Sequence, residues 1–268
     1  GMVNSPTPSY VPTPDPTRAG ALDSTQDQVH IVQAGDTLNT IALRYGVSAD
    51  SIAGANNLTD VNTLSFGQNL LIPTSAQLVG SDIKIIPDSE LLFGPSAQGL
   101  SATYLLSDMD CFLCRYTEVV DGSTLSGPQI IDRISLEQSL NPRLLITLLE
   151  YHAHWISRKV ISEDDLHYPM NYYDRPNDVV GLYKQLDWAG KMLNTGYYGW
   201  RYRGLSTALL ADGTLVQLDP TINAGTAAVQ LLLSQTRTYD EWLSSSRFTG
   251  VGATYTALFG DPFQYAVE

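Results

Sequence analysis

The sequence predicts an α+β protein in which a small βααβ module precedes a larger, mainly α-helical domain with one β-hairpin. Three observations support this prediction. Near the N-terminus, two short β-type runs enclose two short amphipathic runs. Most of the remaining chain has apolar residues at helical spacing, and the turn dipeptide Asp212-Gly213 separates two alternating runs. A length of 268 residues is typical of two domains.

Composition divides the chain into four segments. Residues 1–27 are rich in Pro, Ser, Thr and Asp, and such a segment cannot bury enough apolar surface to fold, so we expect a disordered linker. Residues 28–75 form the compact module, residues 76–99 a connector and residues 100–268 the helical domain. Within the connector, we expect the run SELLFG (89–94) to form a strand that packs on the helical domain.

The charge of the chain excludes several partners. Asp and Glu outnumber Lys and Arg by 28 to 15, which gives a formal net charge of −13. Nucleic acids and anionic membranes both need a Lys/Arg-rich surface, so neither is an expected partner. No apolar run reaches the roughly 18 residues of a membrane-spanning helix. A neutral glycan is compatible with this charge.

Two cysteines, Cys111 and Cys114, lie in the run DCFLC. A CxxC pair can be a redox motif, half of a zinc site or two small core residues. Zinc would need two further ligands, and the chain has only four histidines, so we expect no metal and no cofactor. We expect two buried thiols or, in an exported protein, a local disulfide.

The compact module has recognisable element boundaries. A first strand is expected at residues 29–32 and a second strand closed by Pro73. Thr37 is the expected cap of a first helix, and Ser48 is the expected cap of a second helix that ends at Asn56 and Asn57. The apolar residues of the first helix recur at helical spacing: Leu38, Ile41, Ala42 and Tyr45.

This module resembles the LysM family in residue type and spacing. The resemblance is carried by HIVQAGDTL (30–38), IALRYGV (41–47), ANNL (55–58) and GQNLLIP (67–73). It implies binding to polymers that contain N-acetylglucosamine, either peptidoglycan or a chitin-like glycan. It also implies a shallow groove between two loops, with Gly35, Asp36, Thr37 and Leu38 on one side and Asn56, Asn57, Leu58 and Thr59 on the other.

The same residues have a structural interpretation. Gly35 and Asp36 are typical of a turn, and Asn56 and Asn57 are typical of a helix end. However, the backbone amides at a helix start can also satisfy an N-acetyl group. We therefore predict that the two loops together form the groove, whatever each single side chain does. A single LysM copy binds weakly, so a second sugar-contacting domain or further copies would add avidity.

The helical domain is predicted to contain a buried spine. Helices are expected at residues 126–140, 141–158, 178–196 and 223–236, followed by one or two more, with the hairpin at 206–219. The second of these helices is apolar almost all round, which is typical of a buried helix. A carboxylate near its C-terminal end would be partly desolvated, and desolvation raises a carboxyl pKa as a general acid requires.

The run NPRLLITLLEYHAHW (141–155) resembles the core helix of lysozyme-like lytic transglycosylases and related muramidases, in which a catalytic Glu precedes a small residue and an aromatic. The run TINAGTAAVQLLLSQ (221–235) is similar to a downstream helix of that family. Aligned on Ala153 and Trp155, the Glu position falls on His152, and the nearest carboxylate is Glu150. Two residues correspond to about 200° of helix rotation, so these side chains diverge.

Two interpretations of Glu150 therefore stay open. It is a general acid in a shifted geometry, or the fold is kept and Glu150 is structural, paired with Arg143 or Arg201. His152, with Tyr198, Trp200 and Arg201 from an aromatic stretch, could line a sugar cleft or pack in the core. His152 and His154 are two residues apart and do not form a helical metal pair.

Together these observations predict a protein of the cell envelope or extracellular space that binds peptidoglycan through its LysM-like module. The export signal is expected to lie outside this sequence, whose opening Gly1-Met2 resembles an expression remnant. Two alternatives remain for the helical domain. It is a muramidase or transglycosylase with Glu150 as its acid, or it is a non-catalytic scaffold or targeting part of a larger wall hydrolase.

Overall fold

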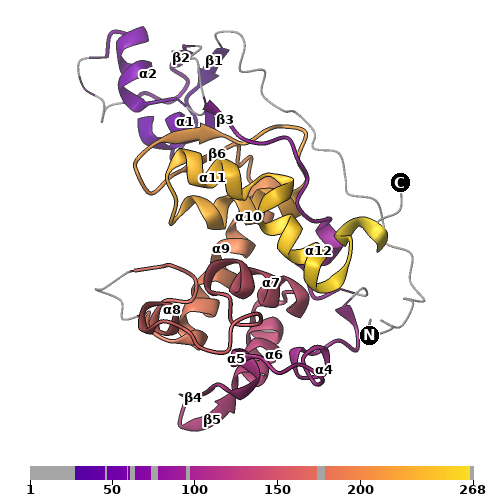
Figure 1. Cartoon of the computed structure of the whole chain (residues 1–268). Helices are drawn as coiled ribbons and strands as arrows, with labels where there is room; N and C mark the ends of the chain where they lie inside the picture. Colours follow the sequence, from indigo (N-terminus) through magenta and orange to yellow (C-terminus); the bar gives the residue numbers. More distant parts are fainter. Residues whose placement is uncertain are drawn as a thin grey trace.

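The computed structural model describes residues 28–45, 47–58, 60, 64–73, 78–94, 97–173 and 179–265. The predicted linker and Thr59 lie outside these residues. The α+β class is confirmed: the described residues form mostly helices with small sheets (Figure 1). Their helices are all too short or too polar to span a bilayer.

The N-terminal module has the predicted βααβ order. Both predicted helix caps form, because the Thr40 N–H donates to Thr37 Oγ1 at 3.1 Å and the Ser51 N–H donates to Ser48 Oγ at 3.0 Å. The two strands pair antiparallel, with Val29 opposite Leu71. The elements are β1 (Gln28–Ile31), α1 (Leu38–Tyr45), α2 (Ala49–Ala55) and β2 (Asn69–Ile72).

This module has a hydrophobic core of its own, separate from that of the helical part. Apolar side chains of both helices pack into one cluster with Leu70 and Ile72 of β2. The C-terminal end of α1 contacts the helical part, where the Ser206 hydroxyl donates to the Arg44 carbonyl at 2.5 Å. The core residues of the module are Val32, Leu38, Ile41, Ala42, Val47, Ile52, Leu70 and Ile72.

The second part is built from helices around one large core. The two predicted helices at 126–140 and 141–158 begin as expected, at a Ser126 capping box and at an Asn141 cap. The helices are α3 (Asp88–Leu91), α4 (Ala102–Leu105), α5 (Phe112–Arg115), α6 (Gly127–Gln138), α7 (Pro142–Ala153), α8 (Glu163–His167), α9 (Leu182–Tyr202), α10 (Ala224–Ser234), α11 (Tyr239–Ser245) and α12 (Ala253–Phe259).

Two small sheets complete the second part. The predicted hairpin at Asp212-Gly213 is present, and its second strand also pairs in parallel with a short strand from the connector. A further hairpin, which the sequence analysis did not predict, projects at the end of the second part opposite the module (Figure 1). The strands are β3 (Leu78–Val79), β4 (Thr117–Val120), β5 (Ser123–Ser126), β6 (Thr207–Leu209) and β7 (Leu215–Gln217).

Three predicted elements are wrong in detail. The helix expected at 141–158 ends at Ala153, because His154 adopts a left-handed conformation with φ of 55°. The run SELLFG is not a strand: its first residues belong to α3, and only Leu92 makes a bridge, to Leu140. The cause is tertiary, because Glu90 of this segment is fully buried against groups from α7 and α12. The helix expected to end at Gly196 instead continues to Tyr202.

Gly196 is retained inside α9 because of helix packing. Every residue of α10 is buried, and α9 packs along it. A Cβ placed on Gly196 would lie 2.6 Å from the Cα of Ala228 in α10, which is closer than two non-bonded carbon atoms can approach. The glycine that resembles a helix stop in the sequence therefore allows two helix backbones to approach each other.

We predict that Gly196→Ala destabilises the helical part by about 1–3 kcal/mol, the usual cost of overpacking a core. The neighbouring variant Thr195→Ala is the control, because Thr195 is exposed on the same helix and should change stability by less than about 0.5 kcal/mol. Chemical denaturation of both variants measures the difference. Equal stabilities would contradict the close approach of α9 and α10.

Candidate glycan-binding site

The first groove loop is organised by Asp36, whose side chain is only 8% exposed. Its carboxylate accepts the Gln33 N–H at 2.8 Å and lies 2.7 Å from Nε2 of His30. The other ring nitrogen of His30 lies 3.0 Å from the Tyr45 hydroxyl. Asp36 therefore ties the loop to β1 and α1, and its carboxylate is occupied inside the module.

The remaining residues of this loop divide between core and surface. Leu38 is 3% exposed and belongs to the core of the module. Gly35 is exposed with φ of +88°, and a Cβ added there would meet no atom within 4 Å. Thr37 is exposed and its hydroxyl caps α1. A ligand could reach this loop at Gly35 and Thr37, but not at the Leu38 side chain.

The second groove loop shows the same division. The Asn56 side chain pairs with the backbone of Leu71, accepting its N–H at 2.7 Å and donating to its carbonyl at 2.6 Å. Leu58 packs against the core. Asn57 is exposed in the left-handed conformation, with φ of 52°. Phe66, which the sequence analysis did not single out, lies in the same connection and is 77% exposed.

The Glu150 carboxylate accepts hydrogen bonds from the backbone that follows α7. Its carboxylate accepts the Ile156 N–H at 2.8 Å and the Ser157 N–H at 3.1 Å, and its other oxygen lies 3.6 Å from Nδ1 of His154. Neither expected arginine is its partner, because Arg143 pairs with Glu90 and Arg201 lies near Asp88. This geometry is that of a carboxylate that closes the turn after a helix.

The other candidate cleft residues do not gather around Glu150. Trp200 is 3% exposed and belongs to the main core, whereas Tyr198 is 40% exposed and stacks along α9 on Tyr202. Arg201 donates to the Tyr197 hydroxyl. His152 contacts Arg237, with 3.2 Å between its Nδ1 and Nη2 of the arginine. Thus the aromatic stretch expected to line a cleft is divided between core and surface.

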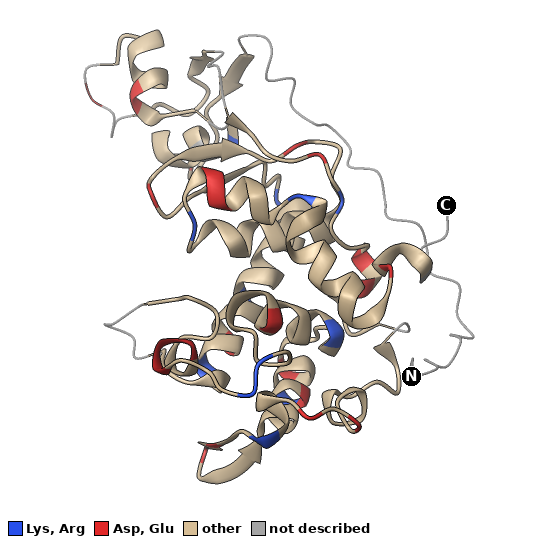
Figure 2. Cartoon of the chain, in the orientation of Figure 1, with Lys and Arg blue, Asp and Glu red and all other residues tan. Residues whose placement is uncertain are grey.

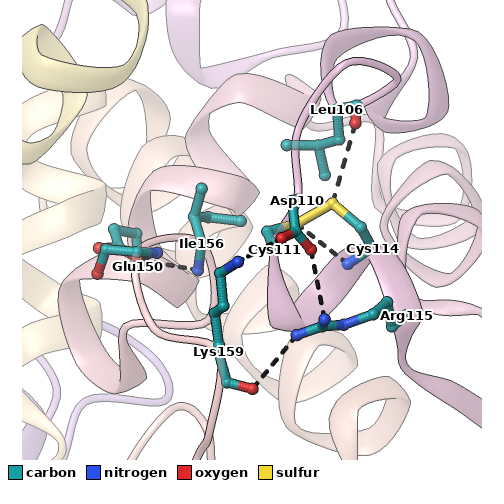
Figure 3. Close-up of a disulfide and its surroundings, with 9 residues drawn as sticks. Leu106, Asp110, Cys111, Cys114, Arg115, Glu150, Ile156 and Lys159 are labelled. Carbon is teal, nitrogen blue, oxygen red and sulfur yellow. Dashed lines mark hydrogen bonds and ion pairs between the residues drawn. A yellow bond between two sulfur atoms is a disulfide. The ribbon is translucent and has the colours of Figure 1, made fainter.

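The CxxC pair forms a local disulfide, one of the two expected alternatives. Figure 3 shows it at the start of α5, next to the Asp110 carboxylate that pairs with Arg115 and Lys159. The disulfide lies beside the turn that Glu150 closes, since the Leu113 N–H of α5 donates to the Trp155 carbonyl at 3.1 Å. Among the described residues, no group of His, Cys, Asp and Glu is arranged to hold a metal ion.

Comparison with known proteins now identifies the class of this chain. Residues 30–73 match the LysM domain, and domains of this type bind peptidoglycan-type glycans, so the chain is a LysM-containing protein. Residues 84–268 match the family described as LasA, N-terminal domain. Because that match covers more than half of the chain, the chain belongs to the LasA N-terminal domain family. The lysozyme-like resemblance of the helical part stays a prediction.

Two curated relatives are named as an amidase and a glycosylase. The chain is 27% identical over 124 residues to N-acetylmuramoyl-L-alanine amidase XlyA of Bacillus subtilis (strain 168). The aligned region covers 42% of this chain and 40% of the amidase. The chain is also 51% identical over 45 residues to the "Putative sporulation-specific glycosylase YdhD" of the same organism. This aligned region covers 17% of the chain and 10% of that protein. The chain thus spans less than half the length of either relative. No solved structure matches it.

We predict that Asp36→Asn removes an acid-sensitive part of the stability of the module. The Gln33 N–H, followed by the His30 side chain, lowers the pKa of Asp36 below its ordinary value of 3.8. A lowered pKa in the folded state contributes stability above the unfolded-state pKa, and this stability is lost as pH falls through the folded-state value. Wild-type stability should therefore fall below about pH 4, and that of Asp36→Asn should fall less.

Hydrogen exchange of the backbone amides of residues 28–73 in the full chain measures this loss. Asp50→Asn is the matched control, because Asp50 is an exposed carboxylate of the same module. Parallel acid dependence in Asp36→Asn and the wild type would show that the hydrogen bonds of Asp36 add no stability.

We predict that Glu150→Ala destabilises the helical part by about 1–3 kcal/mol, because two N–H donors lose a charged acceptor. Glu150→Gln should lose less, because its amide oxygen can still accept one of them. Thermal unfolding measures both variants. A stable Glu150→Gln that abolishes clearing of a peptidoglycan suspension, where the wild type clears it, would instead make Glu150 a general acid.

Proposed function

We propose that this chain binds peptidoglycan through its LysM module and acts as the non-catalytic, wall-targeting part of a cell-wall hydrolase. The observation that carries the proposal is the LysM match at residues 30–73, with exposed residues in both groove loops. The names of the two relatives, an amidase and a glycosylase, support a hydrolase context. A chitin-like oligomer is the simpler ligand of the same groove.

The arrangement of the two parts suits a targeting role. The module contacts the helical part through the C-terminal end of α1, at Arg44. The groove loops lie at the opposite end of this helix, next to Gly35 and Thr37, and at the C-terminal end of α2. A bound glycan would therefore leave the contact between the two parts intact.

We place the protein outside the cytoplasm, in the cell envelope or the extracellular space. The disulfide between Cys111 and Cys114 supports this location, since disulfides persist in oxidising compartments. The glycan it binds is also found there. The charge supports the same view, because 28 acidic residues against 15 basic ones disfavour nucleic acids, and Figure 2 shows acidic positions on both parts of the chain.

The muramidase alternative has less support. A general acid needs a proton to donate and access to the glycosidic oxygen. In this chain the Glu150 side chain is 11% exposed, and one of its oxygens already accepts two backbone N–H groups. A lysozyme-like ancestry of the helical part without its chemistry is compatible with this arrangement.

We predict that Gly35→Asn weakens binding to insoluble peptidoglycan at least tenfold. The added side chain would project from the exposed loop into open space, where it would obstruct a ligand without a clash in the module. Asn also tolerates a positive φ better than most residues. Sedimentation of the full chain with purified sacculi measures the affinity.

Gly213→Asn is the matched control, because Gly213 has φ of +84° and equally open surroundings in the β6–β7 turn. It should bind sacculi like the wild type. If wild-type protein stays in the supernatant with both sacculi and chitin, the proposed function is wrong. If Gly35→Asn and Gly213→Asn bind equally, the groove lies elsewhere on the module.

A further inference from the structure

Arg237 is a partly buried cation whose contacts are all neutral. Its Nη2 lies 3.2 Å from Nδ1 of His152, and its guanidinium lies 5.3 Å from the ring centre of Tyr151. Among the described residues, no carboxylate lies within ion-pair distance of it. The other arginines with buried or half-buried side chains have acidic neighbours: Arg133, Arg143 and Arg201.

The nearby acids are committed to other groups. Glu241 accepts the Thr238 N–H at 3.0 Å and the Thr238 hydroxyl at 2.9 Å, which closes the capping box of α11. Asp212 accepts the Thr214 N–H at 2.9 Å and the Tyr239 N–H at 3.3 Å in the hairpin turn. Glu241 therefore acts on Arg237 only from a distance, and both carboxylates are already held by backbone N–H groups.

Arg237, its contact His152 and its sequence neighbour Thr236 each have one buried polar side-chain atom with no hydrogen-bond partner among the described residues. These atoms are Nε2 of His152, Nε of Arg237 and Oγ1 of Thr236. If Nδ1 of His152 accepts from Arg237, its proton is on Nε2, so all three atoms are available as donors. Buried donors are normally satisfied, so an unsatisfied donor on each of these three residues indicates an absent acceptor.

The electrostatics favour an anionic acceptor. Burial, followed by the charge of Arg237, lowers the pKa of His152 to about 3, so the imidazole is neutral at physiological pH. The cluster therefore carries one positive charge on Arg237 and further neutral donors. A carboxylate matches such a set, because it accepts several hydrogen bonds and pairs with a guanidinium.

We propose that Arg237, His152 and Thr236 bind a carboxylate of an acidic peptide attached to the wall glycan. This inference rests on the proposed function, since peptidoglycan carries acidic peptides and chitin does not. The cluster lies where the C-terminal end of α7 meets the segment between α10 and α11, and Arg237 is partly exposed to solvent. The helical part would thus bind the peptide while the module binds the sugar.

The test compares three soluble probes on the full chain by calorimetry and side-chain NMR. N-acetylmuramyl-L-alanyl-D-glutamate supplies the carboxylates, its diamide lacks them, and chitotetraose reports on the LysM groove alone. The acid should bind at least tenfold tighter than the diamide and should shift the NMR signals of Arg237 Nε and the His152 ring.

Arg237→Met removes the charge and keeps the length of the side chain. It should lose the preference for the acid and bind chitotetraose like the wild type. Its melting temperature should stay equal or rise, because an unpaired, partly buried charge is replaced by an apolar chain. Arg247→Met is the matched control, since Arg247 is exposed and its loss changes the net charge equally.

Each remaining outcome has a defined meaning. Equal affinity of the wild type for the acid and the diamide overturns the carboxylate site, even if chitotetraose binds. An Arg237→Met that melts at a lower temperature and keeps the acid preference makes Arg237 structural. Absence of chitotetraose and sacculus binding, with the acid preference intact, overturns the proposed function of the module and leaves the carboxylate site standing.

Discussion

The arrangement of the helical part depends on one buried carboxylate, that of Glu90. This side chain is completely buried in α3, where it accepts from the Asn141 amide at 3.1 Å and from the Tyr255 hydroxyl. Its charge is balanced by Arg143, whose Nε lies 3.3 Å away. A buried charge is tolerated only when it is paired and hydrogen-bonded, so α3, α7 and α12 must meet at this point.

The same short helix also fixes α10. Asp88 accepts the Gly225 N–H at 2.7 Å and the Asn223 amide at 2.9 Å, so it caps α10 from another part of the chain. Arg201 of α9 lies 3.8 Å from the other oxygen of Asp88. A segment expected to be a connector therefore supplies the polar centre of the helical part. The family match accordingly begins at residue 84, ahead of α3.

The helical part positions the candidate functional side chains on different faces. Along α7, Glu150 faces the turn that follows the helix, whereas His152 faces Arg237. The module contacts the helical part through one end of α1 and carries its groove loops at the other. Under the proposed function, wall binding would depend on the exposed groove loop at Gly35. The buried ion pair of Arg143 with Glu90 instead joins helices of the second part.

Local chemistry sufficed to predict the βααβ module, the caps at Thr37, Ser48, Ser126 and Asn141, and the hairpin at Asp212-Gly213, because each depends on residues close in sequence. Of the candidate site, sequence predicted the two loops, but it could not show which side chains face inward. Asp36 and Asn56 are both typical loop residues, and only the fold brings them to His30 and to Leu71.

The tertiary structure decided the remainder. A helix of four residues replaced the expected strand at Glu90, and α9 continued through Gly196, because partners more than 30 residues away stabilise both choices. Likewise, the contact of His152 with Arg237 joins positions 85 residues apart. The hydrophobic pattern of the sequence does not predict which buried charged residues pair with each other, since those pairs form only when the helices pack.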